Sequence, residues 1–68
     1  MEATILWEGE YFLCQYFYDI YSEKDGVDVH SLDTDKYIGT IKGLKITDES
    51  FEETVKAWLK KQDVNYKF

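Results

Sequence analysis

Two side chains in this sequence could take part in nucleophilic or acid–base chemistry, Cys14 and His30. A cysteine nucleophile needs a base within reach and a third group that orients the base. Cys14 lies in an uncharged, mostly apolar run, residues 11–18, which predicts a buried and unreactive thiol. His30 shares a side of a predicted strand with Asp28, and an exposed histidine beside a carboxylate needs no function. We expect no catalytic residue.

Oxygen-rich residues gather around one predicted turn, where Asp33 and Asp35 follow Asp28 and His30. An EF-hand calcium loop would continue an Asp-x-Asp start with an oxygen ligand and then a glycine. Here those two positions hold a tyrosine and an isoleucine, and zinc would need more cysteine and histidine than the chain contains. We predict turn-capping aspartates, with no metal and no cofactor.

The sequence also contains no motif of a phosphate-binding loop. The four glycines are scattered and form neither a phosphate-binding loop nor a dinucleotide fingerprint. A chain of 68 residues has little room for the roughly 300 Å³ or more that ligand pockets need. We therefore expect that this chain is not an enzyme on its own.

Alternating apolar and polar residues predict the elements that position these groups. The expected strands, antiparallel and three or four in number, are residues 3–7, 11–22, 27–32 and 37–41. Asp25-Gly26 predicts a hairpin turn, and 33–36 predicts a second one. In residues 11–22 both sides of the strand are largely apolar, which indicates a central strand covered on one side by a helix and on the other by a partner.

The last element has the clearest pattern. Ser50 and Glu53 fit a capping box, or Thr47 or Asp48 caps the helix one turn earlier, and apolar residues then recur at helical spacing. These are Phe51, Val55, Trp58 and Leu59. The fold class is therefore α+β, a small antiparallel β-meander of three to four strands with one C-terminal amphipathic helix packed on the sheet. Residues 1–68 form a single domain.

Composition and charge limit the compartment and the partners. The formal net charge is -6, with -8 in residues 1–35 (nine acids and one lysine) and +2 in residues 36–68 (five acids and seven lysines). This acidic balance and the lack of arginine disfavour direct nucleic-acid binding. A single cysteine and no secretory leader indicate the cytoplasm. No window approaches the ~18 apolar residues of a membrane span. A domain this small and without disulfides gains stability by association, so we expect a homodimer.

Aromatic residues are the most unusual feature of the composition. They make up 18% of the chain, and seven of them lie between Trp7 and Tyr21, more than one helix can cover. Tyrosine is favoured at interfaces because its ring can be buried while its hydroxyl stays in contact with water. The residues that we expect to contact another chain are Tyr11, Phe17, Tyr21 and Tyr37.

Acidic residues form a second candidate surface. Six lie in a run with one lysine among them: Asp19, Glu23, Asp25, Asp28, Asp33 and Asp35. Carboxylates spread over a rigid strand face could imitate a row of phosphates and occupy a nucleic-acid-binding channel, as small inhibitors of phages and mobile elements do. The alternative is that these acids only keep an aromatic sheet in solution.

Residues 18–27, followed by residues 47–59, resemble the HicB-type antitoxin module. That family pairs a strand–acidic turn–strand unit with a helix that begins at a threonine, and its members bind a small ribonuclease toxin. Phe51 departs from the small residues common near the start of the family's helix. We assign no family on this resemblance.

The function that we expect is that of a small acidic protein-binding module with a basic protein as its partner. Its sharper form is an inhibitor of a nucleic-acid-handling protein that acts by its acidic face. The alternative is an antitoxin-like or structural subunit of a small complex, which dimerises through an aromatic sheet face without mimicry.

Overall fold

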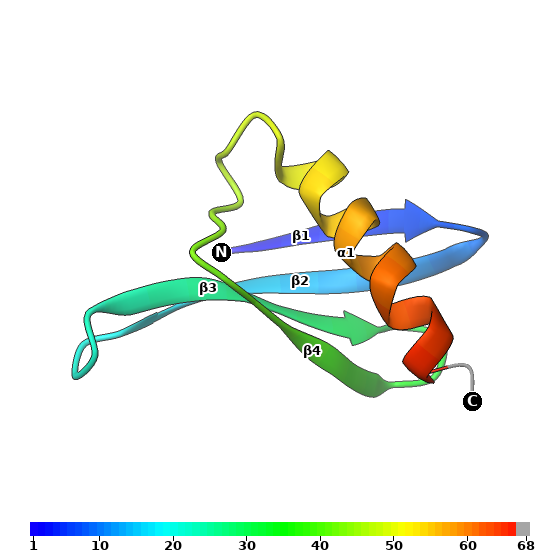
Figure 1. Ribbon diagram of the computed structural model, residues 1–68, viewed down its shortest axis with the longest axis horizontal. Helices are drawn as coiled ribbons and strands as arrows, with labels where there is room; N and C mark the ends of the chain where they lie inside the picture. The colour runs from blue at the N-terminus through cyan, green and yellow to red at the C-terminus, as the bar shows by residue number, and fades with distance from the viewer. Residues whose placement is uncertain (67–68) are drawn as a thin grey trace.

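Four antiparallel strands form one sheet, and a single helix lies across one face of it (Figure 1). The computed structural model describes residues 1–66, and side chains for residues 1–62. The elements are β1 (Glu2–Trp7), β2 (Glu10–Asp19), β3 (Lys24–Ser31), β4 (Lys36–Lys42) and α1 (Phe51–Tyr66). The strands pair in sequence order, which confirms the predicted α+β meander with four strands. Within residues 1–66, no helix is both long and apolar enough to cross a bilayer.

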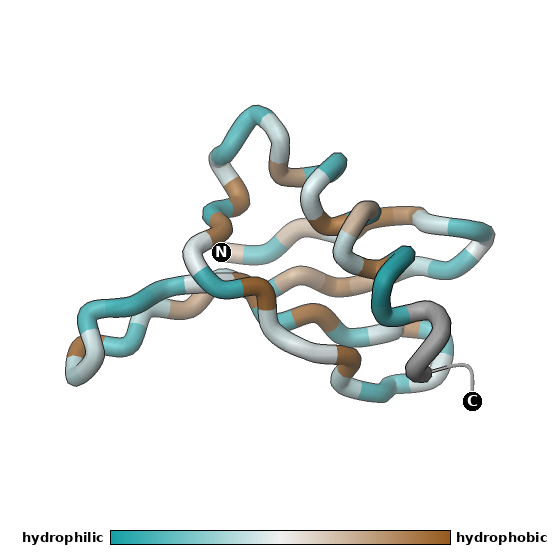
Figure 2. The backbone as a smooth tube through the Cα atoms, in the orientation of Figure 1, coloured by the Kyte–Doolittle hydropathy of each residue, from teal (hydrophilic) through white to brown (hydrophobic). Residues whose placement is uncertain are grey.

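The core lies between the sheet and α1. Successive side chains of a strand point to opposite faces, so one set from each strand meets the helix. The buried hydrophobic residues are Ile5, Phe12, Cys14, Val27, Val29, Leu44, Phe51, Val55 and Leu59. In Figure 2 the hydrophobic colouring recurs along the strands and the helix in the body of the molecule, while the β2–β3 hairpin is mostly hydrophilic.

α1 begins where the capping pattern predicts, because Ser50 immediately precedes the first helical residue. The Thr54 amide donates to the Ser50 carbonyl at 2.8 Å, which is the first hydrogen bond of the helix. Further along, Trp58 packs over Gly39 of β4, and a Cβ at Gly39 would lie 2.7 Å from the indole ring. This close approach sets how near the helix lies to the sheet.

The first connection is a two-residue hairpin turn between Trp7 and Glu10. Glu8 and Gly9 both have positive φ, 49° and 78°. This combination is typical of the type I′ turn, whose twist matches that of the flanking strands.

The hairpin predicted between these two strands exists, but its turn is not at Asp25-Gly26. The turn is residues 20–23, and Asp25 and Gly26 lie inside β3. Asp19 caps the actual turn, since its carboxylate accepts hydrogen bonds from the Tyr21 amide and the Ser22 hydroxyl, both at 3.0 Å. Gly26 is needed in the strand for another reason, because a Cβ there would lie 2.6 Å from a backbone carbonyl oxygen of β4.

Candidate functional site

The face of the sheet opposite α1, called the open face below, carries no helix (Figure 1). Phe12 and Cys14 point to the helix, so the residues of β2 that alternate with them point to the open face. The residues of the other strands that are paired with these alternate residues point to the open face as well. One part of the open face is apolar. We call it the apolar patch, and it consists of Leu6, Tyr11, Leu13, His30, Leu32 and Tyr37.

The members of the apolar patch are neighbours across the strands. Leu6 is paired with Tyr11, and the Leu32 amide donates to the Tyr11 carbonyl at 3.0 Å. His30 contacts Tyr37, with ring centroids 5.4 Å apart and the planes tilted by 60°. Leu6, Tyr11 and Leu32 are each 51% exposed, and Tyr37 is 57% exposed. Large apolar side chains therefore lie together in contact with solvent.

A row of polar side chains borders the apolar patch. The Thr40 hydroxyl donates to the Asp28 carboxylate at 2.6 Å, and a threonine has only one hydroxyl proton. The Tyr37 hydroxyl is therefore the donor in its own hydrogen bond with Thr40. On the same face, toward β1, the side-chain amide of Gln15 donates to the Glu2 carboxylate at 2.8 Å. These bonds hold Tyr37 in one orientation beside His30.

Acidic residues lie at the end of the sheet next to the apolar patch. The β1–β2 turn and the β3–β4 turn lie at the same end of the sheet (Figure 1), so this end carries carboxylates that are distant in sequence. We call this group the acidic end, and it consists of Glu8, Asp33 and Asp35. Glu10 follows the β1–β2 turn, and its carboxylate accepts a hydrogen bond from the hydroxyl of Ser31, the last residue before the β3–β4 turn. This hydrogen bond lies on the helix-covered face of the sheet.

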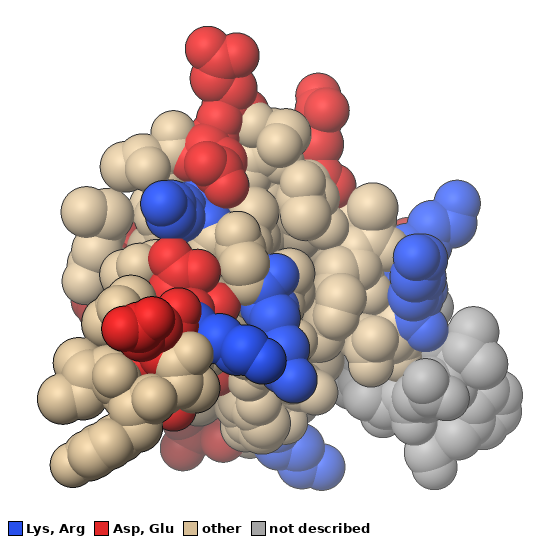
Figure 3. All heavy atoms as spheres, turned by 60° about the vertical axis from the view of Figure 1, so that its left-hand side comes forward, with Lys and Arg blue, Asp and Glu red and all other residues tan. Residues whose placement is uncertain are grey.

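The six acids predicted as one surface are divided by the fold. Asp33 and Asp35 lie in the β3–β4 turn, whereas Asp19 and Glu23 lie at the β2–β3 turn, at the opposite end of β3. The other two lie between these ends on opposite faces of β3: Asp25 on the helix-covered face and Asp28 on the open face. Lysine side chains lie among the carboxylates in the view of Figure 3. The run is therefore not one continuous row.

Two acids of the β2–β3 hairpin are engaged in hydrogen bonds. The Asp25 carboxylate accepts the Tyr16 hydroxyl at 2.8 Å, and this bond, followed by burial, raises the pKa of Tyr16. The hydrogen bonds from Tyr21 and Ser22 lower the pKa of the Asp19 carboxyl below its ordinary value of 3.8. Asp19 thus acts as a turn cap.

The predicted aromatic residues are likewise divided. Tyr11 and Tyr37 belong to the apolar patch, whereas Phe17 lies beyond the polar row and covers Gly26, with its ring 3.2 Å from where a Cβ of that glycine would lie. Tyr21 is 93% exposed in the turn of the β2–β3 hairpin, which extends past the rest of the sheet (Figure 1). Three of the four therefore lie on the open face, and only Tyr11 and Tyr37 belong to the apolar patch.

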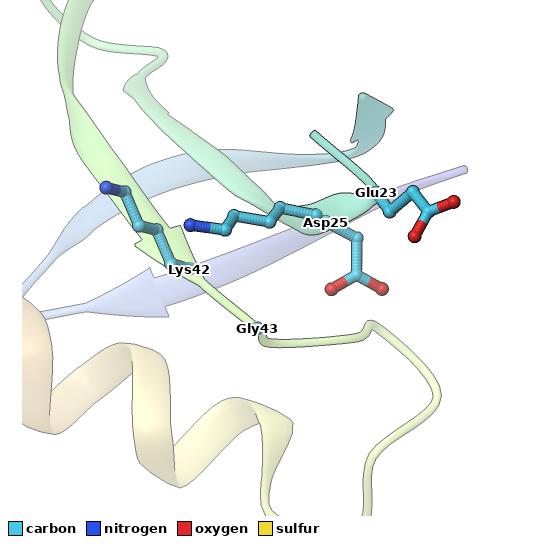
Figure 4. Close-up of a pocket in the computed structure, with 5 residues that line it drawn as sticks. Glu23, Asp25, Lys42 and Gly43 are labelled. Atoms are coloured by element: carbon cyan, nitrogen blue, oxygen red, sulfur yellow. The ribbon is translucent and has the colours of Figure 1, made fainter. Parts of the chain in front are cut away.

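A shallow cavity of about 420 Å³, larger than expected for so short a chain, lies at the base of the β2–β3 hairpin and is lined by Glu23, Lys24, Asp25, Lys42 and Gly43. Figure 4 shows that the carboxylates of Glu23 and Asp25 point away from the ammonium group of Lys42. The charged groups therefore do not converge on a common ligand position.

The candidate catalytic pair is not brought together. Cys14 is buried on the helix-covered face, where burial raises the pKa of its thiol to about 11, and His30 lies on the open face. At neutral pH the thiol is protonated and is a poor nucleophile. Among the residues described here, no three histidine, cysteine, aspartate or glutamate side chains gather as metal ligands would.

Sequence reasoning missed several residues of this surface. Leu6 and Leu32 were not expected there, nor was Glu8 at the acidic end. Strand alternation could have identified Leu6, because it lies between Ile5 and Trp7, which face the helix. Nothing in the sequence alone places the turn of Glu8 at the same end as Asp33, because the meander determines the end at which each turn lies.

Comparison of this chain with protein-family models, with curated proteins and with solved structures finds no match.

Proposed function

We propose that this chain is a protein-binding module that docks through the apolar patch of its open face. One observation carries the proposal: Leu6, Tyr11, Leu32 and Tyr37 are neighbours on one face, and each is about half exposed or more. Monomeric proteins rarely expose a contiguous apolar surface unless it binds something. Tyrosine and leucine in a strand-supported patch have few rotamers to lose when a partner docks.

The charge beside the apolar patch favours a basic partner. Glu8, Asp33 and Asp35 lie at the adjoining end of the sheet, and Lys36 is the lysine nearest to them in sequence. Opposite charges at the rim of an interface steer association and exclude wrong partners more than they add affinity. The partner that fits is therefore a protein with an apolar surface and a basic rim.

Affinity capture with matched variants tests this proposal. A tagged protein is incubated with a nuclease-treated lysate of its native host, and retained proteins are identified by mass spectrometry. We expect one protein to be retained by the unaltered chain and by Tyr21→Ser, whose side chain lies outside the patch, but to be lost with the double change Tyr11→Ser and Tyr37→Ser. Retention by the double variant, once its circular dichroism confirms folding, would refute docking through the patch.

A sharper form of the proposal is inhibition of a nucleic-acid-handling protein, and the acidic end supports it. Contacts between exposed charges weaken as salt rises, because the Debye length shortens from ~10 Å at 0.1 M to ~3 Å at 1 M. If the acidic end imitates phosphate, a captured nucleic-acid-binding protein is released at high salt. Retention at 1 M salt supports the alternative, in which the chain is an antitoxin-like or structural subunit held by apolar contacts.

A further inference from the structure

Each edge strand of the sheet presents backbone groups that the sheet itself leaves unpaired. In an antiparallel ladder, pairs of residues that hydrogen-bond to each other alternate with pairs that do not. In the second kind of pair, the N–H and C=O groups of each residue point away from the other strand. The Tyr16 amide donates to the Met1 carbonyl at 3.0 Å, so these two residues form a hydrogen-bonded pair. Alternation from this pair turns the backbone groups of three residues of β1 outward: Glu2, Thr4 and Leu6.

The opposite edge, β4, is protected against pairing. The Gly43 amide donates to the Asp25 carbonyl at 2.8 Å, and alternation from that pair turns the backbone groups of Thr40 and Lys42 outward. Lysines occupy both ends of this strand, at Lys36 and Lys42, and a bulge interrupts its pairing with β3. Charged ends and bulges discourage a second chain from adding to an edge.

β1 has less protection. Glu2 is the single charged residue among its six, and the side chains of Thr4 and Leu6 are exposed. Within the part of the chain that the structure describes, no loop, cap or side chain hydrogen-bonds to the outward backbone groups of Thr4 or Leu6. An uncovered edge of this kind is a template for another strand.

We propose that the occupant of the β1 edge is a second copy of this chain, paired antiparallel so that two four-stranded sheets join into one. A two-fold axis at Thr4 sets Thr4 opposite the Thr4 of the second copy, and it sets Glu2 opposite the second copy's Leu6. Each outward amide then meets an outward carbonyl. In this register no two like charges face each other.

The helix-covered face of β1 supports the same register. Ala3 comes to lie opposite the Ile5 of the second copy, and Met1, which is 75% exposed in the single chain, comes to lie opposite the second copy's Trp7. Apolar residues therefore meet apolar residues on this side of the joined sheet. This self-complementarity favours a second copy over an unrelated strand, which would have to supply a matching sequence.

The proposed pairing shares only Leu6 with the apolar patch. A two-fold axis perpendicular to the sheet leaves both open faces on the same side, so the other members of the patch stay uncovered on each copy. The dimer would then present two patches and could bind a two-fold symmetric partner at both.

Oligomeric state tests the inference, measured by sedimentation equilibrium across a hundredfold range of concentration. The unaltered chain should pass from its monomer mass of 8.1 kDa to twice that mass. Thr4→Pro removes an outward donor without breaking the β1–β2 ladder, and proline is tolerated on an edge strand in that position. We expect Thr4→Pro to remain a monomer. Thr4→Ala, which keeps the amide, and Lys42→Pro, at the other edge, should still dimerise.

Hydrogen exchange on the unaltered chain provides a second measurement if Thr4→Pro fails to fold. Raising the concentration should slow exchange at the Thr4 and Leu6 amides and leave those of Thr40 and Lys42 unchanged. The inference would be overturned if the unaltered chain stayed monomeric or if folded Thr4→Pro still formed a dimer. It would also be overturned if the exchange rate of the Thr4 amide did not change with protein concentration. A dimer that is lost with Tyr11→Ser and Tyr37→Ser would overturn it as well, because that result assigns the interface to the open face.

Discussion

Gly26 is a glycine because β3 and β4 approach closely at this position. A Cβ there would lie 2.6 Å from the Ile41 carbonyl oxygen and 3.1 Å from the Lys42 Cα, both of them backbone atoms that cannot move without shifting the strand. The ring of Phe17 covers the same glycine from the open face. An aromatic ring over a strand glycine restores packing that the missing side chain would have supplied.

We predict that Gly26→Ala destabilises the fold by about 1–3 kcal/mol, the usual range for overpacking a close contact. Gly39→Ala should cost less, since the added methyl group meets the side-chain ring of the partly exposed Trp58 rather than backbone. Urea denaturation followed by tryptophan fluorescence measures both. The explanation fails if Gly26→Ala is the milder of the two changes.

The Asp19 cap predicts a pH dependence of the β2–β3 turn. Hydrogen bonds from Tyr21 and then Ser22 lower the pKa of Asp19 below 3.8, so the charged form is the one that the fold stabilises. This contribution is fully present above pH 3.8 and is lost as the pH falls through the lowered pKa. A carboxyl carbon NMR titration should give a midpoint below 3.8, with the Tyr21 amide shifting in the same step. A midpoint at or above 3.8 would contradict the cap.

At the scale of elements, α1 stabilises the sheet by covering one face of it. Val55 and Leu59 are fully buried against the strands, whereas Lys60 is exposed. The apolar stripe that the sequence predicts is therefore the side of the helix that packs on the core. A helix of 16 residues is marginal in isolation, and its stability comes from this packing.

Leu59→Ala should therefore destabilise the protein by about 2–5 kcal/mol, the range for deleting a buried leucine side chain. For a domain of this size each 1 kcal/mol lowers Tm by roughly 4–8 °C. Lys60→Ala, one position further along, should shift Tm by less than about 4 °C. Thermal unfolding followed by circular dichroism compares the two variants, and equal shifts would show that the stripe does not face the core.

Much of the element pattern can be predicted from the sequence, because strand alternation and the helical stripe are local signals. The β1–β2 turn at Gly9 and the helix start at Ser50 are of this kind. The β2–β3 turn is not, since Asp25-Gly26 is a strong local turn signal that the tertiary packing of Gly26 against β4 overrides. The turn lies at residues 20–23 instead and is capped by Asp19. Nothing in the sequence distinguishes Asp19 from the other aspartates before the turn has formed.

At the scale of the whole molecule, the chain presents an amphipathic sheet with a helix on one face only. Sequence reasoning predicts an aromatic surface and an acidic surface, and Tyr11 and Tyr37 are the predicted residues that lie in the apolar patch. It does not predict that Glu8 joins Asp33 at one end, nor that Tyr21 lies far from Tyr37 along the chain's longest dimension, since both follow from the order in which strands fold back. Composition predicts an aromatic surface and an acidic surface, and topology determines which residues share a face.

Site-specific photo-crosslinking tests docking through the apolar patch most directly. A benzophenone amino acid is placed at Tyr11, within the patch, and in a second protein at Tyr21, in the β2–β3 turn; both positions are at least half exposed. After illumination in a lysate of the native host, we predict that Tyr11 gives a crosslink to the protein retained in affinity capture and that Tyr21 gives none. A crosslink to that protein from Tyr21 and none from Tyr11 would contradict the account.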